Sequence, residues 1–244
     1  MFRKKTAKPL KNANALLNSR SPFAYVESYK STRTNLEFST FGGEVQTILF
    51  TSSIPNEGKS SVVINTATTL AEANHKVLLI DADLRSPIIG RYLRIRQEKN
   101  EGLSTILAGT SSYKDSIYEY APGGFDIIMA GPVPPNPSEL LSRKMVSELM
   151  ETLKKEYDFI LIDTPPVGVV SDAATLSTHV DGAVFIVRNN FTKRDVAYEA
   201  LRLLKASNVK LLGSILNDYD VSRDLNAATG YEYTYHYDPL QDND

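Results

Sequence analysis

Residues 45–73 read VQTILFTSSIPNEGKSSVVINTATTLAEA, and this stretch decides the fold class. It begins with VQTILFTSS, an apolar run of strand length, and its last part, from Gly58 through Ala73, has the pattern of a helix. The loop between them is close to the phosphate-loop pattern G-x-x-x-x-G-K-[ST], with Ser53 in place of the first glycine. A strand before this loop and a helix after it are the context that the motif requires. We therefore predict a nucleotide phosphate site here.

The residue types of the loop suit the binding of Mg-ATP. Backbone N–H groups of a tight loop, together with a helix N-terminus, can surround a phosphate, and Gly58 lets the chain come close. We expect Lys59 to bridge the β- and γ-phosphates and the Ser60 hydroxyl to ligate Mg²⁺. The alternative, a lysine at an ordinary helix start, does not explain the surrounding pattern. The residues expected to bind the nucleotide are Ser53, Asn56, Glu57, Gly58, Lys59, Ser60 and Ser61.

Strands and helices alternate along the rest of the chain. We expect further strands at 76–83, 125–131, 158–166, 181–189 and 209–218, helices at 21–38, 137–156 and 194–206, and an irregular stretch between residues 83 and 125. Ser21 and Pro22 should start the first helix, and Gly42 and Gly43 should end it. The alternation and the near-continuous apolar strands predict an α/β three-layer sandwich, a mostly parallel sheet with helices on both faces.

Carboxylates follow two of the expected strands. Asp81 and Asp83 come at the end of VLLI, and Asp163 comes at the end of FILI. Ligands in parallel sheets bind beyond the carboxyl ends of the strands, where these side chains would meet the phosphate loop. A strand-end aspartate can also be a simple helix cap. Beside a phosphate loop, however, the pattern favours Mg²⁺ held by Ser60, Asp81 and Asp163, with one carboxylate left to accept a proton.

Composition limits the other possibilities. The 244 residues include 27 basic and 29 acidic side chains, a formal net charge of -2, so charge does not favour nucleic acid as a partner. The absence of cysteine excludes disulfides and thiolate zinc sites and fits a reducing compartment. No run reaches the roughly 20 apolar residues of a membrane helix, and no secretory signal is evident. We expect a cytoplasmic protein with at most indirect or peripheral membrane contact.

The two ends of the chain differ from its centre. Residues 1–20 carry six Lys or Arg and no acid, which predicts a mobile basic arm, either simply solvated or in contact with anionic lipid or an acidic partner. The central domain is expected over 21–225. A flexible tail is expected over 226–244. Four of the thirteen tyrosines lie close together in this tail, at Tyr231, Tyr233, Tyr235 and Tyr237.

The tyrosine cluster allows two interpretations. Its period-two alternation, YEYTYHY, is compatible with an edge strand. Gly230, Pro239 and the acidic end QDND instead favour an exposed tail, whose hydroxyls could accept phosphoryl groups and gain about -1.5 to -2 charge each. A mobile chain end could also enter the active site of a neighbour.

In combination, these motifs resemble those of the bacterial tyrosine kinases of capsule and exopolysaccharide systems, the CpsD/CapB/YwqD group. The resemblance runs from about residue 21 to the tail and rests on SSIPNEGKSS (Walker A), VLLIDADLRSP (Walker A′), AGPVPPNPSELLS, ILIDTPPVGVVSDA (Walker B) and the tyrosine cluster. It implies a P-loop NTPase fold of the MinD/ParA-like kind. It also implies an ATP:protein tyrosine phosphotransferase that uses ATP and Mg²⁺.

The resemblance assigns catalytic roles to Lys59, Asp81 and Asp83. Lys59 would steady the phosphates, while Ser60 would hold Mg²⁺ with water-mediated help from Asp81 and Asp163. Asp81 would also activate the acceptor tyrosine, and Asp83 would orient it. A phenol has a pKa near 10, so a carboxylate of ordinary pKa can accept its proton only as the P–O bond forms.

Two further sets of residues follow from the resemblance. Asn217 and Asp218 lie where related ATPases contact the base. Glu27, Lys30 and Arg33 match an E-x-x-R-x-x-R oligomerisation motif, with Lys30 in place of the first Arg and therefore without a bidentate fork. These three residues share one helical face, so an internal ion-pair ladder is the alternative. In a closed ring, one subunit would phosphorylate the tail of the next.

The resemblance also implies partners. Kinases of this group that lack membrane segments work with a transmembrane polysaccharide co-polymerase, which would activate this chain and recruit it to the inner face of the membrane. A cognate tyrosine phosphatase and other protein substrates are expected, and nucleic acid is not. Phosphorylated tails would disfavour the ring, so that assembly would cycle during polysaccharide synthesis and export.

Two other functions remain open from the sequence. A MinD/ParA-like ATPase switch would hydrolyse ATP without forming phosphotyrosine. A nucleotide-gated scaffold would bind Mg-ATP with negligible turnover, and other enzymes would modify its tail. A nicotinamide-binding dehydrogenase is disfavoured because no G-x-G-x-x-G follows the first strand.

Overall fold

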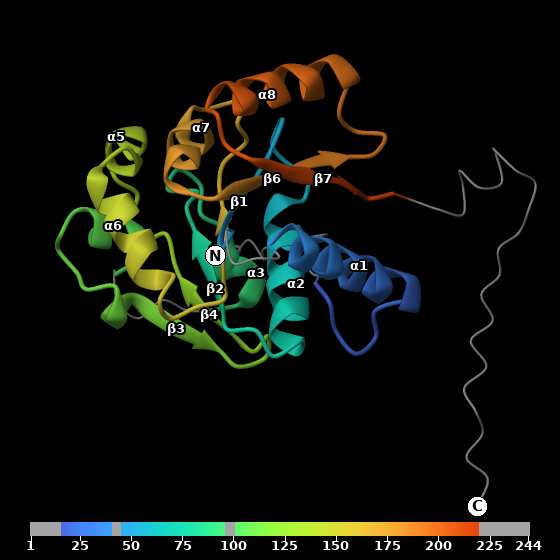
Figure 1. The fold of residues 1–244 in the computed structure, drawn as a ribbon, viewed down its shortest axis with the longest axis horizontal. Coiled ribbons are helices and arrows are strands. Elements are labelled where there is room, and N and C mark those ends of the chain that lie inside the picture. The colour runs from blue at the N-terminus through green and yellow to red at the C-terminus, as the bar shows by residue number, and fades with distance from the viewer. Residues whose placement is uncertain (1–15, 41–44, 96–100, 220–244) are drawn as a thin grey trace, which may run out of the picture.

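The protein is built around a seven-stranded β-sheet. The computed structural model describes residues 16–40, 45–95 and 101–219. The strand order is β3-β4-β2-β5-β1-β6-β7 (Figure 1). Neighbouring strands pair in parallel, except for the antiparallel pair β3 and β4. The strands are β1 (Thr47–Ser52), β2 (Val77–Asp81), β3 (Ile117–Tyr120), β4 (Phe125–Ile128), β5 (Phe159–Asp163), β6 (Gly182–Arg188) and β7 (Leu211–Asn217). The six predicted strands are confirmed, and β3 is an addition within the stretch predicted to be irregular.

The described part of the chain also contains eight α-helices, of which α1 precedes β1 and the others lie between strands. They are α1 (Phe23–Ser39), α2 (Lys59–Glu72), α3 (Ile89–Leu93), α4 (Leu103–Leu107), α5 (Pro137–Leu141), α6 (Lys144–Leu153), α7 (Asp172–Leu176) and α8 (Arg194–Ala206), with 3-10 turns at Lys114–Ser116 and Ser177–His179. The predicted helices that became α1, α2 and α8 are confirmed. α1 ends at Ser39, and Gly42 and Gly43 lie outside the described residues.

The prediction of one helix over 137–156 was wrong, because two helices occupy this range. Arg143 has extended backbone angles (φ -71°, ψ 147°) and is the N-cap of α6, so α5 ends before it. Its guanidinium donates a hydrogen bond of 3.3 Å to the carbonyl of Leu107 at the end of α4. A contact between distant segments therefore accompanies a break that no glycine or proline marks in the sequence.

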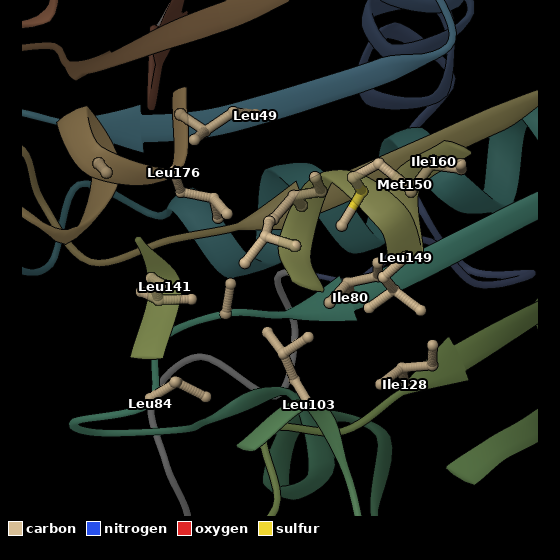
Figure 2. Packing of buried hydrophobic residues seen from close by; sticks show 14 of the residues in the cluster. Leu49, Ile80, Leu84, Leu103, Ile128, Leu141, Leu149, Met150, Ile160 and Leu176 are labelled. Atoms are coloured by element: carbon tan, nitrogen blue, oxygen red, sulfur yellow. The ribbon is translucent and has the colours of Figure 1, made fainter. Parts of the chain in front are cut away.

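The hydrophobic core has one layer on each face of the sheet. α1, α2 and α3 pack on one face. Helices α4 to α8 pack on the other, where Leu103, Leu141, Leu149 and Leu176 surround the strand residue Ile80 (Figure 2). Figure 1 shows α1 and α2 on the opposite side of the sheet from α5 and α6. The expected three-layer α/β sandwich is confirmed.

The described chain begins at Leu16, within the expected basic arm, and ends at Tyr219, within the expected central domain. Leu16 and Leu17 pack against the α1–α2 side of the core, and the Leu17 N–H donates to Asn65 Oδ1 at 2.9 Å. The rest of the expected basic arm, residues 1–15, lies outside the described residues, as does the chain from residue 220. Within the described ranges, we find no helix that combines the length and the apolar character needed to cross a membrane.

Candidate functional site

The loop after β1 has the geometry of a phosphate cradle. Gly58 is the N-cap of α2 and has φ +86°, a left-handed conformation that favours glycine. A Cβ atom at this position would lie 2.1 Å from Asn217 Nδ2, so a larger side chain would also collide with β7. Asn56 is left-handed as well, with φ +68°. The loop therefore turns tightly and directs the first N–H groups of α2, a fourteen-residue helix, toward the carboxyl end of the sheet.

Lys59, Ser60 and Asp163 meet at this end of the sheet. The Ser60 hydroxyl donates to Asp163 Oδ2 at 2.5 Å, and Lys59 Nζ lies 4.0 Å from Asp163 Oδ1. The Asp163 side chain is fully buried. Burial raises the pKa of Asp163, although the Lys59 charge and the Ser60 hydrogen bond oppose the rise. The structure thus brings together the three residues that the sequence placed on two separate strand ends.

Asp81 lies beside Asp163 because β2 and β5 pair in register at these two residues. Its side chain is almost fully buried, and its two oxygens accept long hydrogen bonds from the N–H groups of Asp83 (3.2 Å) and Ile89 (3.3 Å). Burial, followed by the negative charges of Asp163 and Asp83, holds the pKa of Asp81 well above its ordinary value. Two adjacent buried carboxylates with raised pKa values are typical of a site that binds a cation or a proton.

Asp83 is more exposed and organises the turn that follows β2. Its Oδ1 accepts from the N–H groups of Ser86 at 2.9 Å and Arg85 at 3.3 Å. The side chain therefore closes a local turn, as short polar side chains commonly do. This carboxylate is the partly open member of the predicted group of three aspartates.

Two buried polar atoms in this region lack hydrogen-bond partners within the described residues. They are Asp163 Oδ1 and the hydroxyl oxygen of Ser53. Buried polar atoms are rarely left unpaired, so both atoms fit a site that is completed by Mg²⁺ and a nucleotide. The described residues hold no group of three or more His, Asp or Glu side chains that converge on a metal. A magnesium ion bound with phosphates needs only one or two protein carboxylates, so the residues present fit Mg-ATP.

Glu57 has a different environment from the one the sequence suggested. Its carboxylate is 1% exposed and accepts hydrogen bonds from the Ile54 N–H (2.7 Å), the Arg188 N–H (3.3 Å) and the Thr192 hydroxyl (2.5 Å). The side chain therefore fixes the phosphate loop to the segment after β6. Sequence reasoning missed Arg188 and Thr192, because nothing local connects them with a loop some 130 residues earlier.

Asn217 and Asp218 both have partners within the chain. Asn217 Nδ2 donates to the Glu57 carbonyl at 2.8 Å, which holds the phosphate loop from the β7 side. Asp218 Oδ2 accepts from the Arg188 Nε (3.0 Å) and Nη2 (2.9 Å) atoms, and the Arg188 guanidinium lies over the Phe191 ring at 4.9 Å. The structure places these residues beside the phosphate loop, and their contact with a base stays a prediction.

A third buried aspartate, Asp172, joins the turn after β2 to the surrounding helices. Arg85 donates to both carboxylate oxygens, at 2.7 Å from Nε and 2.9 Å from Nη2, and the Ser138 hydroxyl adds a bond of 2.6 Å. Burial by itself would raise the pKa of Asp172, but the hydrogen bonds from Arg85 and Ser138 hold it below its ordinary value. No local pattern indicates that Arg85 and Asp172 pair, because they lie 87 residues apart in the chain.

The proposed oligomerisation residues lie along α1. Lys30 Nζ is 2.8 Å from Glu27 Oε1, and both side chains are about two-fifths exposed. Arg33 instead donates to the Thr69 carbonyl of α2 at 3.1 Å and approaches Glu37 at 3.7 Å. The internal ion pair that the helical spacing allowed is therefore present between Glu27 and Lys30. The tail tyrosines, Tyr231, Tyr233, Tyr235 and Tyr237, lie outside the described residues.

Comparisons with known proteins agree with this geometry. A family model described as an AAA domain matches residues 47–187. YwqD of Bacillus subtilis, named a tyrosine-protein kinase, is 36% identical over 197 residues, which are 81% of this chain and 82% of that protein. CapB of Staphylococcus aureus, named a putative tyrosine-protein kinase, is 34% identical over 207 residues, 85% of this chain and 89% of CapB.

Solved structures show the same relationship. The kinase domain of the Escherichia coli tyrosine kinase Etk superposes with a TM-score of 0.77 at 34% identity, covering 86% of this chain and 80% of that domain. The septum site-determining protein MinD of Pyrococcus horikoshii, solved with Mg-ADP, superposes with a TM-score of 0.61 at 28% identity, covering 72% of this chain and 71% of MinD. The P-loop ATPase fold of the MinD kind, expected from the sequence, is confirmed.

Proposed function

The chain belongs to the bacterial tyrosine kinases, the family of YwqD and CapB, and we propose that it uses Mg-ATP to phosphorylate its own C-terminal tyrosines. One observation carries the proposal. Asp163 is fully buried, has one oxygen without a hydrogen-bond partner in the described chain, and lies against Ser60 and Lys59. Such a group would hold a divalent cation beside the phosphates that Lys59 binds.

The residues around this carboxylate have complementary roles in the proposal. Lys59 and the N–H groups at the start of α2 bind the phosphates, and Ser60 and Asp163 hold Mg²⁺. Mg²⁺, when bound, neutralises charge that develops on the transferred phosphoryl group. Glu57 and Asn217 position the loop through the contacts described above. Positioning and charge neutralisation supply most of the acceleration.

The reaction also requires a group that accepts the phenol proton of the acceptor tyrosine. The tyrosine oxygen forms a bond to the γ-phosphorus, the bond from that phosphorus to the β-bridging oxygen breaks, ADP leaves, and the phenol proton passes to a carboxylate. Asp81, which ends β2 beside Asp163, is the carboxylate that would accept this proton as the P–O bond forms. Because Asp81 is nearly fully buried, the acceptor meets the more exposed Asp83 first, and Asp83 orients it.

The same proposal includes the assembly of the kinase and its protein partners. Subunits assemble through α1, so that one active site receives the tail of the next subunit. A transmembrane polysaccharide co-polymerase activates the kinase at the inner face of the membrane, and a cognate phosphatase reverses the modification. Other proteins are further substrates. The similarity of this chain to named capsule-system kinases and the exposed Glu27 and Lys30 pair on α1 support this setting.

Phosphosite mass spectrometry on the purified chain with Mg-ATP tests the proposal. Wild type and Lys59→Met are compared at high protein concentration, with and without a cytoplasmic segment of a candidate activator. We expect Lys59-dependent phosphate on Tyr231, Tyr233, Tyr235 or Tyr237. ATP hydrolysis without phosphotyrosine, even with the activator, would instead support a MinD-like ATPase switch. Tail phosphorylation that survives Lys59→Met would support a scaffold modified by another enzyme.

A further inference from the structure

A groove of about 340 Å³ lies between α4 and the loop that joins β4 to α5. We call it the proline groove. Its walls are formed by Ser104, Thr105, Ala108, Pro132, Val133, Pro134, Pro135, Asn136, Glu139, Leu140 and Arg143. Three prolines and Val133, which is 62% exposed, make one wall apolar. This wall is the segment AGPVPPNPSELLS, which the nucleotide site does not use.

The proline groove lies at the catalytic edge of the sheet. β4 pairs in parallel with β2, so the loop after β4 leaves the sheet at the same end as Asp81. α5 forms part of the groove, and its Ser138 hydroxyl bonds both Asp172 and Arg85. Arg85 belongs to the turn that Asp83 closes. The groove and the carboxylate that orients the acceptor are thus connected through one hydrogen-bonded cluster.

The base of the groove is fixed to the sheet. The N–H groups of Leu103 and Ser104, at the start of α4, donate to the carbonyls of Met129 (2.8 Å) and Ala130 (3.0 Å), which follow β4. A Cβ atom on Gly102 would lie 2.4 Å from the Met129 carbonyl oxygen, so the two segments are in close contact. A groove with a rigid base can select a ligand by shape without a large ordering cost.

One polar atom in the groove lacks a partner. The Ser104 side chain is among the groove-lining residues, the residue is 4% exposed, and its hydroxyl oxygen has no hydrogen-bond partner among the described residues. A buried hydroxyl without a partner is costly, which indicates that a ligand group completes it. A wall of proline and valine with one such hydroxyl matches the chemistry of a tyrosine side chain, an apolar ring with a polar tip.

We propose that the proline groove binds a non-reacting tyrosine of the segment Tyr231–Tyr237 from a second copy of the chain, beside the tyrosine that is being phosphorylated. This inference rests on the proposed kinase function. In an extended segment, residues i and i+2 lie on one face, so one tyrosine of the cluster could occupy the groove while another is held at the active site. The two-residue spacing of the cluster thereby acquires a physical reason.

Charge and chain length agree with this occupant. The groove carries one charge of each sign, Arg143 and Glu139, so Arg143 can pair with Glu232 or Asp238 of the tail only at its own end of the groove. The described chain ends at Tyr219, just after β7, which is five strands from β4 in the sheet. The twelve residues from there to Tyr231 can span up to about 40 Å when extended, enough to reach a neighbour in an assembly.

A trans-phosphorylation assay tests the groove. The enzyme is the full chain, and the acceptor is isotopically labelled Lys59→Met chain with a native tail, so mass spectrometry separates the two products. We expect Val133→Asp to raise the KM for the acceptor roughly tenfold, with the KM for ATP unchanged, because it places a charge in an apolar contact. Ser104→Ala should raise the acceptor KM by a smaller factor. Val196→Asp on α8, also an exposed valine, is the matched control.

A binding measurement keeps this inference separate from the kinase proposal. A fluorescent peptide of residues 229–240 is titrated into the Lys59→Met chain and its Val133→Asp derivative. If wild type transfers no phosphate but the peptide binds and Val133→Asp weakens it about tenfold, the groove stands and the kinase function fails. Equal behaviour of Val133→Asp and Val196→Asp in both assays would overturn the groove. Transfer to the enzyme's own tail alone would overturn its assignment to a second copy.

Discussion

Two buried aspartates nine residues apart, Asp163 and Asp172, have opposite electrostatic environments. Both side chains are fully buried. Asp172 accepts three hydrogen bonds, two of them from the Arg85 guanidinium, and its pKa is held below the ordinary value against the effect of burial. The Asp163 carboxylate accepts a hydrogen bond from Ser60, its Oδ1 has no hydrogen-bond partner among the described residues, and burial raises its pKa.

The two aspartates differ in whether groups of the chain compensate their negative charge. The charge of Asp172 is compensated within the chain, so this residue ties the turn after β2 to α5 and α7. The charge of Asp163 is compensated only in part, by Lys59 at 4.0 Å, and Asp81 beside it adds a second carboxylate. An incompletely compensated buried carboxylate destabilises the ligand-free fold, and a bound cation would relieve it. Burial alone therefore does not mark the carboxylate proposed to bind a cation, whereas the lack of hydrogen-bond partners among the described residues does.

The largest expected effect is on activity at Asp163. Asp163→Asn keeps the shape of the side chain but removes the charge that holds Mg²⁺, so we expect phosphotransfer to fall by at least about 10²-fold. The unfolding free energy of the nucleotide-free protein should stay the same or increase. Quantified phosphotyrosine formation, a Mg²⁺ titration and urea unfolding measure these three results. A destabilised Asp163→Asn protein would contradict the comparison.

Asp172→Asn should show the reverse pattern. The amide cannot accept the bidentate guanidinium bond, so we expect the unfolding free energy to fall by about 2 kcal/mol. The affinity for Mg-ADP should change by less than a factor of about three, because Asp172 does not face the phosphate loop directly. Urea unfolding and calorimetric titration check the two expectations. Arg85→Lys, which keeps the charge but not the fork, serves as the milder variant.

The pH dependence of stability should also distinguish Asp81, which lies beside Asp163, from Asp172. A raised pKa in the folded state contributes stability below the unfolded value, near 3.9, and this stability is lost as the pH rises through the folded pKa. We therefore expect Asp81→Asn to raise the melting temperature of the Mg²⁺-free protein by a few degrees at pH 7.5 and by less at pH 5. Thermal scans in a chelator measure the difference from wild type. An equal difference at both pH values would contradict a raised pKa of Asp81.

The contribution of Asp172 to the stability of the fold should change with pH in a more acidic range. A lowered pKa contributes stability above the unfolded value, and that stability is lost only as the pH falls below about 4. The difference in melting temperature between wild type and Asp172→Asn should therefore be constant from pH 7.5 to pH 5 and should shrink only in more acidic buffer.

The parts of the fold with strong local signals could be predicted from the sequence. Long apolar strands and the amphipathic α8 carry their pattern within ten or so residues, and the phosphate loop defines the start of α2 through Gly58. The four-residue β3 carries too short an alternation to be distinguished from a loop. The break between α5 and α6 comes at Arg143, which bonds Leu107 some 36 residues away. No local pattern contains that contact.

In the candidate site, too, local motifs could be predicted from the sequence and contacts between distant segments could not. The sequence predicted Lys59, Ser60, Asp81 and Asp163 because strand ends and a loop motif mark them. It could not predict that the Glu57 carboxylate would accept a hydrogen bond from Thr192, or that Asn217 would donate one to the Glu57 carbonyl. Those contacts depend on β6 and β7 lying next to β1, which is a property of the strand order.

The smallest expected effect concerns the ion pair on α1, in which neither side chain is buried, whereas Asp172 is fully buried in its pair with Arg85. Glu27 and Lys30 are each about two-fifths exposed, so solvent screens their attraction, and Lys30→Ala should change the unfolding free energy by less than about 0.5 kcal/mol. If α1 joins subunits, the same substitution should weaken self-association in sedimentation velocity, and Lys30→Arg should strengthen it through the bidentate fork. Because the fold is nearly indifferent to this pair, any change in association reports on contacts with a second copy. Unchanged association in both variants would leave Lys30 with only its internal partner.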